Sequence, residues 1–191
     1  MTNVKNILLV GVGGQGTILT SKILSKGFVE HGYDVKMAEI HGMSQRGGSV
    51  TTQIRYGEKV YSPVIEKGTV DIIVSFEKTE ALRWIDYLKK DGTIIVNDYE
   101  IHPVTVNTGA AKYPENVIEE YERAIDHVKV IKAHAIAEEL GTTKCMNIVL
   151  LGALVKLFSL EAINWKEFIK TTVPPKAVET NIKAFDRGYE I

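Results

Sequence analysis

The feature that most constrains the fold is an apolar run that leads directly into a glycine-rich turn. Residues 7–10 are continuously apolar, and Gly11, Gly13 and Gly16 follow them with the spacing G-x-G-x-x-G. A continuous apolar run is typical of a parallel strand that is covered on both faces. The glycines permit a tight turn, a close approach of the backbone and close packing of the next helix. The stretch therefore predicts a strand, a turn and a helix in an α/β fold.

The rest of the sequence alternates between strand and helix patterns. Further strands are predicted at 33–40, 49–56, 70–75, 93–97 and 128–132. Helices are predicted at 15–31, 77–90, 115–126, 135–140, 145–159, 164–171 and 175–186. We therefore expect residues 1–191 to form a single three-layer α/β/α Rossmann-like domain with a mostly parallel sheet.

Two local features of this plan are specific enough to be checked. The strand at 49–56 is expected to turn back at Gly57 into a short strand at 59–62, which gives a β-hairpin insertion. The first helix is expected to place one apolar stripe toward the core, made of Ile18, Leu19, Ile23, Leu24, Phe28 and Val29.

Composition and charge exclude several classes of protein. The chain has 23 basic and 24 acidic residues, so no overall field attracts nucleic acid or an anionic membrane. Its single cysteine, Cys145, excludes an internal disulfide and a self-contained four-cysteine zinc or iron–sulfur site. Residues 1–6 lack the features of a signal peptide, and no apolar run approaches the ~18 residues of a membrane span. We expect a soluble, cytoplasmic protein.

A second glycine-bearing stretch follows the second predicted strand. It reads Glu39-Ile40-His41-Gly42-Met43-Ser44-Gln45-Arg46-Gly47-Gly48 and is expected to form a surface loop. Arg46 carries a planar fork of donors that suits a phosphate or a carboxylate. A solvated arginine or a local salt bridge is the simpler interpretation of the same residue.

The sequence of the glycine turn does not identify the ligand or partner that the turn would contact. Exposed N–H groups and the positive end of the next helix favour an anion, and Gly14 adds a position without a side chain. Glu39 stands where a dinucleotide enzyme places the acid that binds the ribose, so a domain that binds NAD(P) or FAD is one interpretation. The second interpretation is that the turn packs against another protein chain. The histidines show no ligand spacing, and the sequence has no readable catalytic triad.

Together these stretches resemble the gamma-type domain of the 2-oxoacid:ferredoxin oxidoreductases. The resemblance is carried by Gly11-Val12-Gly13-Gly14-Gln15-Gly16 and by His41-Gly42-Met43-Ser44-Gln45-Arg46-Gly47-Gly48. The second motif is most similar to the small (beta) subunits of indolepyruvate ferredoxin oxidoreductases. Asn147 and the run at 149–154 resemble a later signature of those subunits.

That resemblance implies a subunit of an enzyme that oxidises an aryl pyruvate with coenzyme A to an acyl-CoA, CO2 and reduced ferredoxin. Thiamine diphosphate, Mg and iron–sulfur clusters would reside on a large catalytic (alpha) subunit, and ferredoxin would act with the complex. This chain would bind no cofactor alone, supply no catalytic residue and be inactive by itself.

The resemblance also implies which residues face the large subunit, the substrate or the coenzyme. They are Gly11, Gly13, Gly14, Gln15, Gly16, His41, Ser44, Gln45, Arg46, Gly47, Gly48 and Asn147. Arg46 would steady a substrate carboxylate or a coenzyme phosphate, and Gln15 would donate its amide in the same region. The alternatives are an autonomous NAD(P)- or FAD-binding dehydrogenase or redox sensor, and a scaffold that only stabilises its partner.

Overall fold

The computed structural model describes residues 4–41 and 47–191. The strands are β1 (Lys5–Val12), β2 (Asp34–His41), β3 (Ser49–Gly57), β4 (Val70–Ser75), β5 (Leu88–Asn97) and β6 (His127–Ile131). The α-helices are α1 (Thr17–Glu30), α2 (Val104–Asn107), α3 (Val117–Ala124), α4 (Ala133–Glu139), α5 (Met146–Leu157), α6 (Trp165–Thr172) and α7 (Val178–Tyr189). Short 3-10 helices are η1 (Glu80–Tyr87), η2 (Thr143–Cys145) and η3 (Pro175–Ala177).

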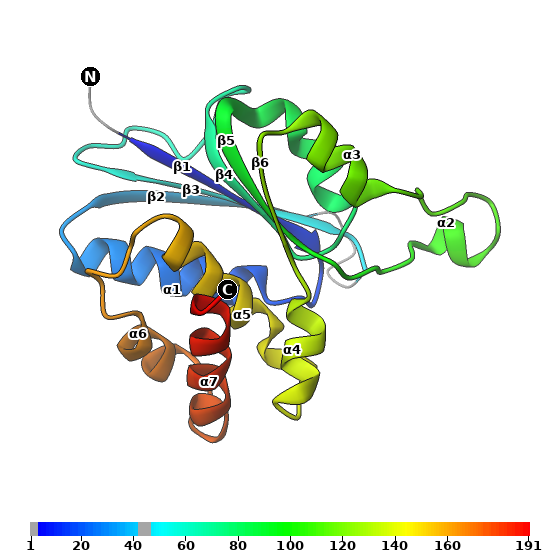
Figure 1. Ribbon diagram of the computed structural model, residues 1–191. Helices are drawn as coiled ribbons and strands as arrows, with labels where there is room; N and C mark the ends of the chain where they lie inside the picture. Colours follow the sequence, from blue (N-terminus) through cyan, green and yellow to red (C-terminus); the bar gives the residue numbers. More distant parts are fainter. Residues whose placement is uncertain (1–3, 42–46) are drawn as a thin grey trace.

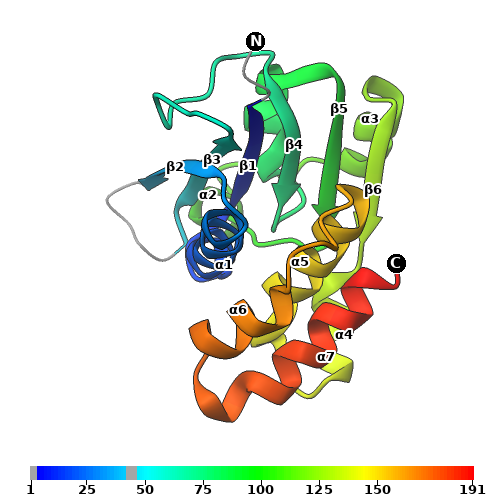
Figure 2. The same cartoon turned by 90° about the vertical axis from the view of Figure 1, so that its left-hand side faces the viewer.

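The strands form one mixed sheet in the order β2-β3-β1-β4-β5-β6. Strands β1, β4, β5 and β6 pair in parallel, whereas β3 pairs antiparallel with both β1 and β2. Strand β2 therefore runs in the same direction as β1. Helices α1 and α4 to α7 cover one face of the sheet, and α3 lies on the other (Figures 1 and 2). The predicted three-layer arrangement with a mostly parallel sheet is confirmed.

Strand β1 supplies both sides of the core. Ile7 and Leu9 belong to the cluster that packs against α1 and α5, while Leu8 and Val10 belong to the cluster on the opposite face. All four side chains are completely buried. Burial of such a side chain contributes about 1.5–3 kcal/mol, so the continuous apolar run is what fixes β1 at the centre of the layers.

Helices α5 and α7 approach so closely that their backbones are in contact. A side chain at Gly152 would collide with the carbonyl oxygen of Phe185, and one at Gly188 would collide with the carbonyl oxygen of Val149. Glycine is therefore required on both helices. Helix α5 is buried along most of its length, as its apolar sequence predicts.

The β-hairpin lies elsewhere than predicted. It is formed by β2 and β3, and residues 59–62 are not a strand. The side chain of Asp34 accepts a hydrogen bond from the N–H of Val60 and pairs with Lys59 at 3.3 Å. Side-chain contacts, not strand pairing, therefore hold the segment that follows β3.

The predicted helix at 77–90 is also wrong in kind and extent. The structure has the 3-10 helix η1, and β5 already begins at Leu88 and runs through Asp91 and Gly92, which lie between the predicted helix and the predicted strand at 93–97. The carboxylate of Glu77 accepts the N–H groups of Thr79 and Glu80. A register shift in the pairing of β4 with β5 accommodates the additional residues of β5.

The buried stripe of α1 is narrower than predicted. Ile23, Leu24 and Phe28 are completely buried, but Ile18 is 40% and Val29 56% exposed. Gly32 follows the helix with φ +90°, a left-handed conformation that is common for glycine where a helix ends.

Candidate functional site

The predicted motifs meet at the edge of the sheet where the parallel strands end. We call this the carboxyl edge. The turn at 13–16 follows β1, Phe76 and Glu77 follow β4, and Asp98 follows β5. Because β2 ends and β3 begins at the same edge, His41 at the end of β2 and Gly47 and Gly48 just before β3 lie there as well. Ligands of α/β sheets commonly bind at this edge.

The side chain of Gln15 fastens the glycine turn to the end of β4. Its Oε1 accepts a hydrogen bond from the N–H of Val12 at 2.7 Å, and its Nε2 donates to the carbonyl of Phe76 at 2.8 Å. A Cβ atom at Gly11 would lie 2.9 Å from both Gln15 and Phe76. The absence of a side chain at this first glycine therefore leaves room for the side chain of Gln15. Gln15 therefore uses both of its polar atoms inside the chain.

Asn147 connects α5 to the same turn. Its Nδ2 lies 3.3 Å from the carbonyl oxygen of Gly16 and 3.3 Å from Oγ1 of Thr20. Gly16 has φ +85°, and a side chain there would lie 2.8 Å from Nδ2 of Asn147. Asn147 is 1% exposed, and its side chain supports the turn from the side of α5.

The second motif joins the turn through backbone hydrogen bonds. The N–H of Gly13 donates to the carbonyl of Gly48 at 2.8 Å, and the N–H of Gly47 donates to the carbonyl of Gly13 at 3.4 Å. Gly47 has φ +77°, a conformation that favours glycine. The predicted site residues Ser44, Gln45 and Arg46 lie outside the residues that the structure describes.

Two surface hollows flank the turn. The first, of about 460 Å³, is lined by Gly13, Gly14, Gly16, Thr17, Ile18, Leu19, Lys22, His41 and Val50. The second, of about 360 Å³, is lined by Gly13, Gly14, Gln15, Gly16, Leu19, Tyr99, Ile101, His134, Thr143, Lys144, Met146 and Asn147. The structure thus brings the glycine turn, His41 and Asn147 together around these two hollows.

The glycine turn lacks the geometry of a dinucleotide site. In the common dinucleotide-binding order the strand that carries the ribose acid is next to β1. Here β3 separates β2 from β1, so the strand that carries Glu39 is two strand spacings away, roughly 10 Å. Glu39 instead accepts a hydrogen bond from Oγ of Ser21 on α1 at 3.4 Å.

The chain is also poorly suited to hold an iron–sulfur cluster. Cys145 is completely buried, and burial raises the pKa of its thiol, which disfavours the thiolate that a cluster requires. Within residues 4–41 and 47–191, no three His, Cys, Asp or Glu side chains gather in a way that could hold a metal ion.

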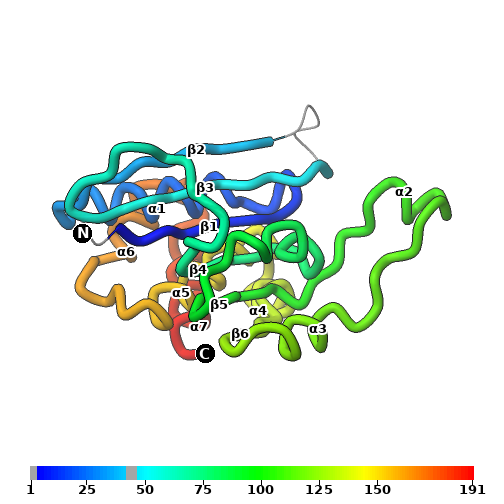
Figure 3. The backbone as a smooth tube through the Cα atoms, turned by 90° about the horizontal axis from the view of Figure 1, so that it is seen from above, coloured from blue at the N-terminus to red at the C-terminus, as the bar shows by residue number. Residues whose placement is uncertain are grey.

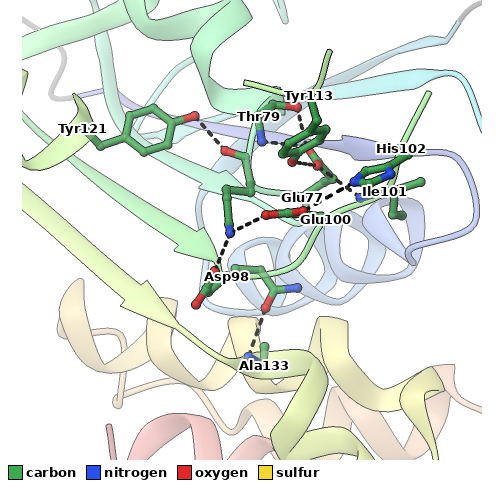
Figure 4. Close-up of polar contacts among 11 residues, drawn as sticks. Glu77, Thr79, Asp98, Glu100, Ile101, His102, Tyr113, Tyr121 and Ala133 are labelled. Atoms are coloured by element: carbon green, nitrogen blue, oxygen red, sulfur yellow. Dashed lines mark hydrogen bonds and ion pairs between the residues drawn. The ribbon is translucent and has the colours of Figure 1, made fainter. Parts of the chain in front are cut away.

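A buried carboxylate at the carboxyl edge escaped the sequence analysis. Glu77 is 1% exposed. It accepts hydrogen bonds from the N–H and hydroxyl of Thr79, the N–H of Glu80, the N–H of Ile101 and the hydroxyl of Tyr113. Figure 4 shows Thr79, Ile101 and Tyr113, from three separate segments, around this carboxylate. An acid two residues after the end of a buried strand was the available signal.

Lys78 forms a second polar group beside Glu77. Its Nζ lies 2.9 Å from Asp98 and 2.8 Å from Glu100 (Figure 4). Burial alone would lower the pKa of Lys78, but the hydrogen bonds to the two acids raise it. The hydrogen bond from Lys78 holds the pKa of Glu100 below its usual value. Burial and the hydrogen bond to Glu77 raise the pKa of Tyr113, so its hydroxyl remains a donor.

Comparison with known proteins gives one consistent family. Residues 6–191 match the model of the family described as pyruvate ferredoxin/flavodoxin oxidoreductase. The indolepyruvate oxidoreductase subunit IorB of Pyrococcus horikoshii is 43% identical over 97% of this chain and 94% of its own length. The IorB subunit of Archaeoglobus fulgidus is 39% identical over 96% of this chain and 93% of its own length.

Solved structures share the fold. The pyruvate oxidoreductase subunit PORC of Thermotoga maritima superposes with a TM-score of 0.71 and 24% identity over 98% of this chain and 96% of that chain. A 2-oxoglutarate:ferredoxin oxidoreductase of Magnetococcus marinus, solved with 2-oxoglutarate, coenzyme A and succinyl-CoA bound, gives 0.74 with 22% identity. That match covers 98% of this chain and 30% of the Magnetococcus chain. Among the described residues, no helix is long and apolar enough to cross a membrane.

Proposed function

Because the chain belongs to the pyruvate ferredoxin/flavodoxin oxidoreductase family, we propose that it is the small subunit of an indolepyruvate-type 2-oxoacid:ferredoxin oxidoreductase. Residues 1–191 serve as one gamma-type domain. The complex oxidatively decarboxylates an aryl pyruvate and transfers the acyl group to coenzyme A. The products are an acyl-CoA, CO2 and reduced ferredoxin.

The cofactors of this reaction reside on a large catalytic subunit. Thiamine diphosphate with Mg supplies the carbanion chemistry, and iron–sulfur clusters accept the electrons one at a time. The buried position of the single cysteine and its raised pKa support this division of labour. The small subunit contributes a surface, not a reacting group.

The observation that carries the proposal is the direct contact between the three signature stretches. The glycine turn bonds to Gly48 at 2.8 Å and to Asn147 at 3.3 Å, so residues far apart in the sequence share one edge. We assign this edge the role of docking on the large subunit next to its active centre. Arg46 steadies a substrate carboxylate or a coenzyme phosphate there, while Gln15 and Asn147 keep the turn in shape.

Reconstitution tests the proposal. The chain alone, its large subunit alone and the co-expressed pair are assayed for reduction of ferredoxin with indolepyruvate and coenzyme A. We expect turnover only from the pair. Turnover by the isolated chain, or binding of NAD or FAD to it at micromolar concentration, would contradict the proposal and favour an autonomous redox domain.

A further inference from the structure

The chain carries an arm that projects from the body of the molecule. The arm, residues 101–113, leaves the carboxyl edge after β5, contains the short helix α2 and returns to α3 (Figures 1 and 3). No residue of α2 is buried, and Val104 is 76% exposed. The arm therefore contributes little to the core of this chain.

The base of the arm is nevertheless firmly held. The N–H of Ile101 at its start and the hydroxyl of Tyr113 at its end both donate to the buried carboxylate of Glu77. The amide of Asn107 donates to the carbonyl of His102 at 3.0 Å, which closes the first turn of the arm on itself. One carboxylate thus pins both ends of the arm at the carboxyl edge.

The tip has an unusual composition for an exposed segment. A quarter of the whole chain is charged, but residues 103–111 contain no charged side chain. The segment includes Val104, Val106, Ala110 and Ala111. An ordered, uncharged projection with almost no packing of its own loses conformational entropy without burying apolar surface. A partner surface that covers the tip would supply the missing burial.

We propose that this arm inserts into an uncharged cleft of the large subunit and anchors the small subunit there. The inference rests on the proposed function, which supplies the large subunit as the partner. The arm starts from the same edge as the glycine turn, so one partner contacts both. Its lack of charge suits an apolar recess, in which a charged tip would remain desolvated and unpaired.

Charge introduced at the tip tests this proposal in the complex. Val104→Asp and Ala110→Lys are compared with Val64→Asp, which makes the same change at a residue 60% exposed in the connection between β3 and β4, at the opposite edge of the sheet. Each full-length chain is titrated against the tagged large subunit, and its thermal unfolding is measured alone. We expect binding at least tenfold weaker for both arm variants, native binding for Val64→Asp, and unchanged melting temperatures.

The outcomes separate the two proposals. If the unchanged chain binds the large subunit and both arm variants bind within twofold of it, the arm is not an anchor, although the proposed function stands. If the folded, unchanged chain does not bind the large subunit at all, the proposed function fails and the docking role of the arm fails with it. Weaker binding by Val64→Asp equal to that of the arm variants would also overturn the arm's specific role.

Discussion

The amide nitrogen of Asn147, at the start of α5, lies 3.3 Å from the carbonyl oxygen of Gly16, at the start of α1. The same nitrogen lies 3.3 Å from the hydroxyl of Thr20. One buried side chain therefore ties the glycine turn to a helix that follows it by more than a hundred residues. The shape of the proposed docking surface depends on this contact as much as on the glycines.

Replacement of Gly16 by alanine should destabilise the chain more than the same change at Gly14. Both residues have positive φ, so each alanine costs about 1–2 kcal/mol in backbone conformation. A side chain at position 16 also displaces Asn147, whereas one at position 14 meets nothing within 4 Å. We expect an additional loss of about 1–2 kcal/mol for Gly16→Ala, measured by urea unfolding.

The double variant Gly16→Ala/Asn147→Ala identifies the source of that difference. Removal of the Asn147 side chain relieves the collision, so the two changes should cost less together than the sum of the single changes. Strict additivity would show that the contact between the two residues does not matter to stability.

Asp34 should make stability depend on acid pH. Hydrogen bonds from Lys36 and Val60 and the pairing with Lys59 lower the pKa of its carboxyl. A group whose pKa is lowered by folding stabilises the protein above its unfolded pKa, about 3.9, and that contribution is lost as the pH falls through and below this value. We expect Asp34→Asn to be less stable than the native chain at pH 7, by a margin that is smaller at pH 3 and closes only below the lowered pKa of the folded state.

Glu58→Gln is the matched control for Asp34→Asn. Glu58 is exposed and forms no ion pair with any residue in the described part of the chain. Its variant should follow the native chain at both pH values in urea unfolding. A gap between Asp34→Asn and the native chain that is constant with pH would contradict the assignment.

Loss of the Tyr113 hydroxyl should free one end of the arm. Tyr113→Phe removes a hydrogen bond to the buried carboxylate of Glu77, a loss of about 1.5 kcal/mol for a bond to a charged group. Hydrogen exchange should accelerate across residues 101–113, and trypsin should cut more readily after Lys112. Tyr61→Phe, at a side chain that is 86% exposed, should change neither. Native exchange rates in Tyr113→Phe would show that Glu77 does not hold the arm.

Arg46→Ala should impair the assembled enzyme without dissociating it. If the guanidinium binds a carboxylate or phosphate, its removal should raise the KM for the 2-oxoacid or for coenzyme A by roughly tenfold. Arg46→Lys keeps the charge but not the fork of donors, so it should recover only part of the loss. Lys59→Ala, at the opposite edge of the sheet, is the control. Unchanged turnover and unchanged KM for both substrates would favour the scaffold interpretation.

Strands with a continuous apolar sequence were predictable because burial on both faces leaves an unambiguous pattern. Residues 70–75, whose apolar side chains at 70 and 72–74 are buried on both faces of the sheet, were predicted with the bounds that β4 has. The hairpin was predicted at the wrong place. Gly57 indicates that the strand ends there, but it does not indicate which other strand pairs with it. Strand β3 pairs antiparallel with both β1 and β2. This arrangement depends on contacts between segments far apart in the sequence, which a local sequence pattern does not contain.

Some residues of the candidate site were predicted from local motifs, and others depend on contacts between distant segments. The glycine turn and Asn147 were found because recurrent motifs mark them, and the structure brings them into contact. Glu77 was missed because its donors Ile101 and Tyr113 come from far along the chain. Leu82, Ile85 and Leu88 are spaced as on one face of a helix, so the sequence predicted a helix that continues past the end of η1. In the structure Leu88 already belongs to β5, where it pairs with Val70.

The reversed strand β3 has a consequence for how such a protein diversifies. The register of β2 on β3 and of β3 on β1 is set by backbone pairs along the full length of the strands, which end at His41 and begin again at Ser49. That connection can gain, lose or exchange residues while the frame beneath it stays the same. Sequence changes between His41 and Ser49 can therefore alter what this edge of the sheet recognises without altering the strand pairs that hold the fold together.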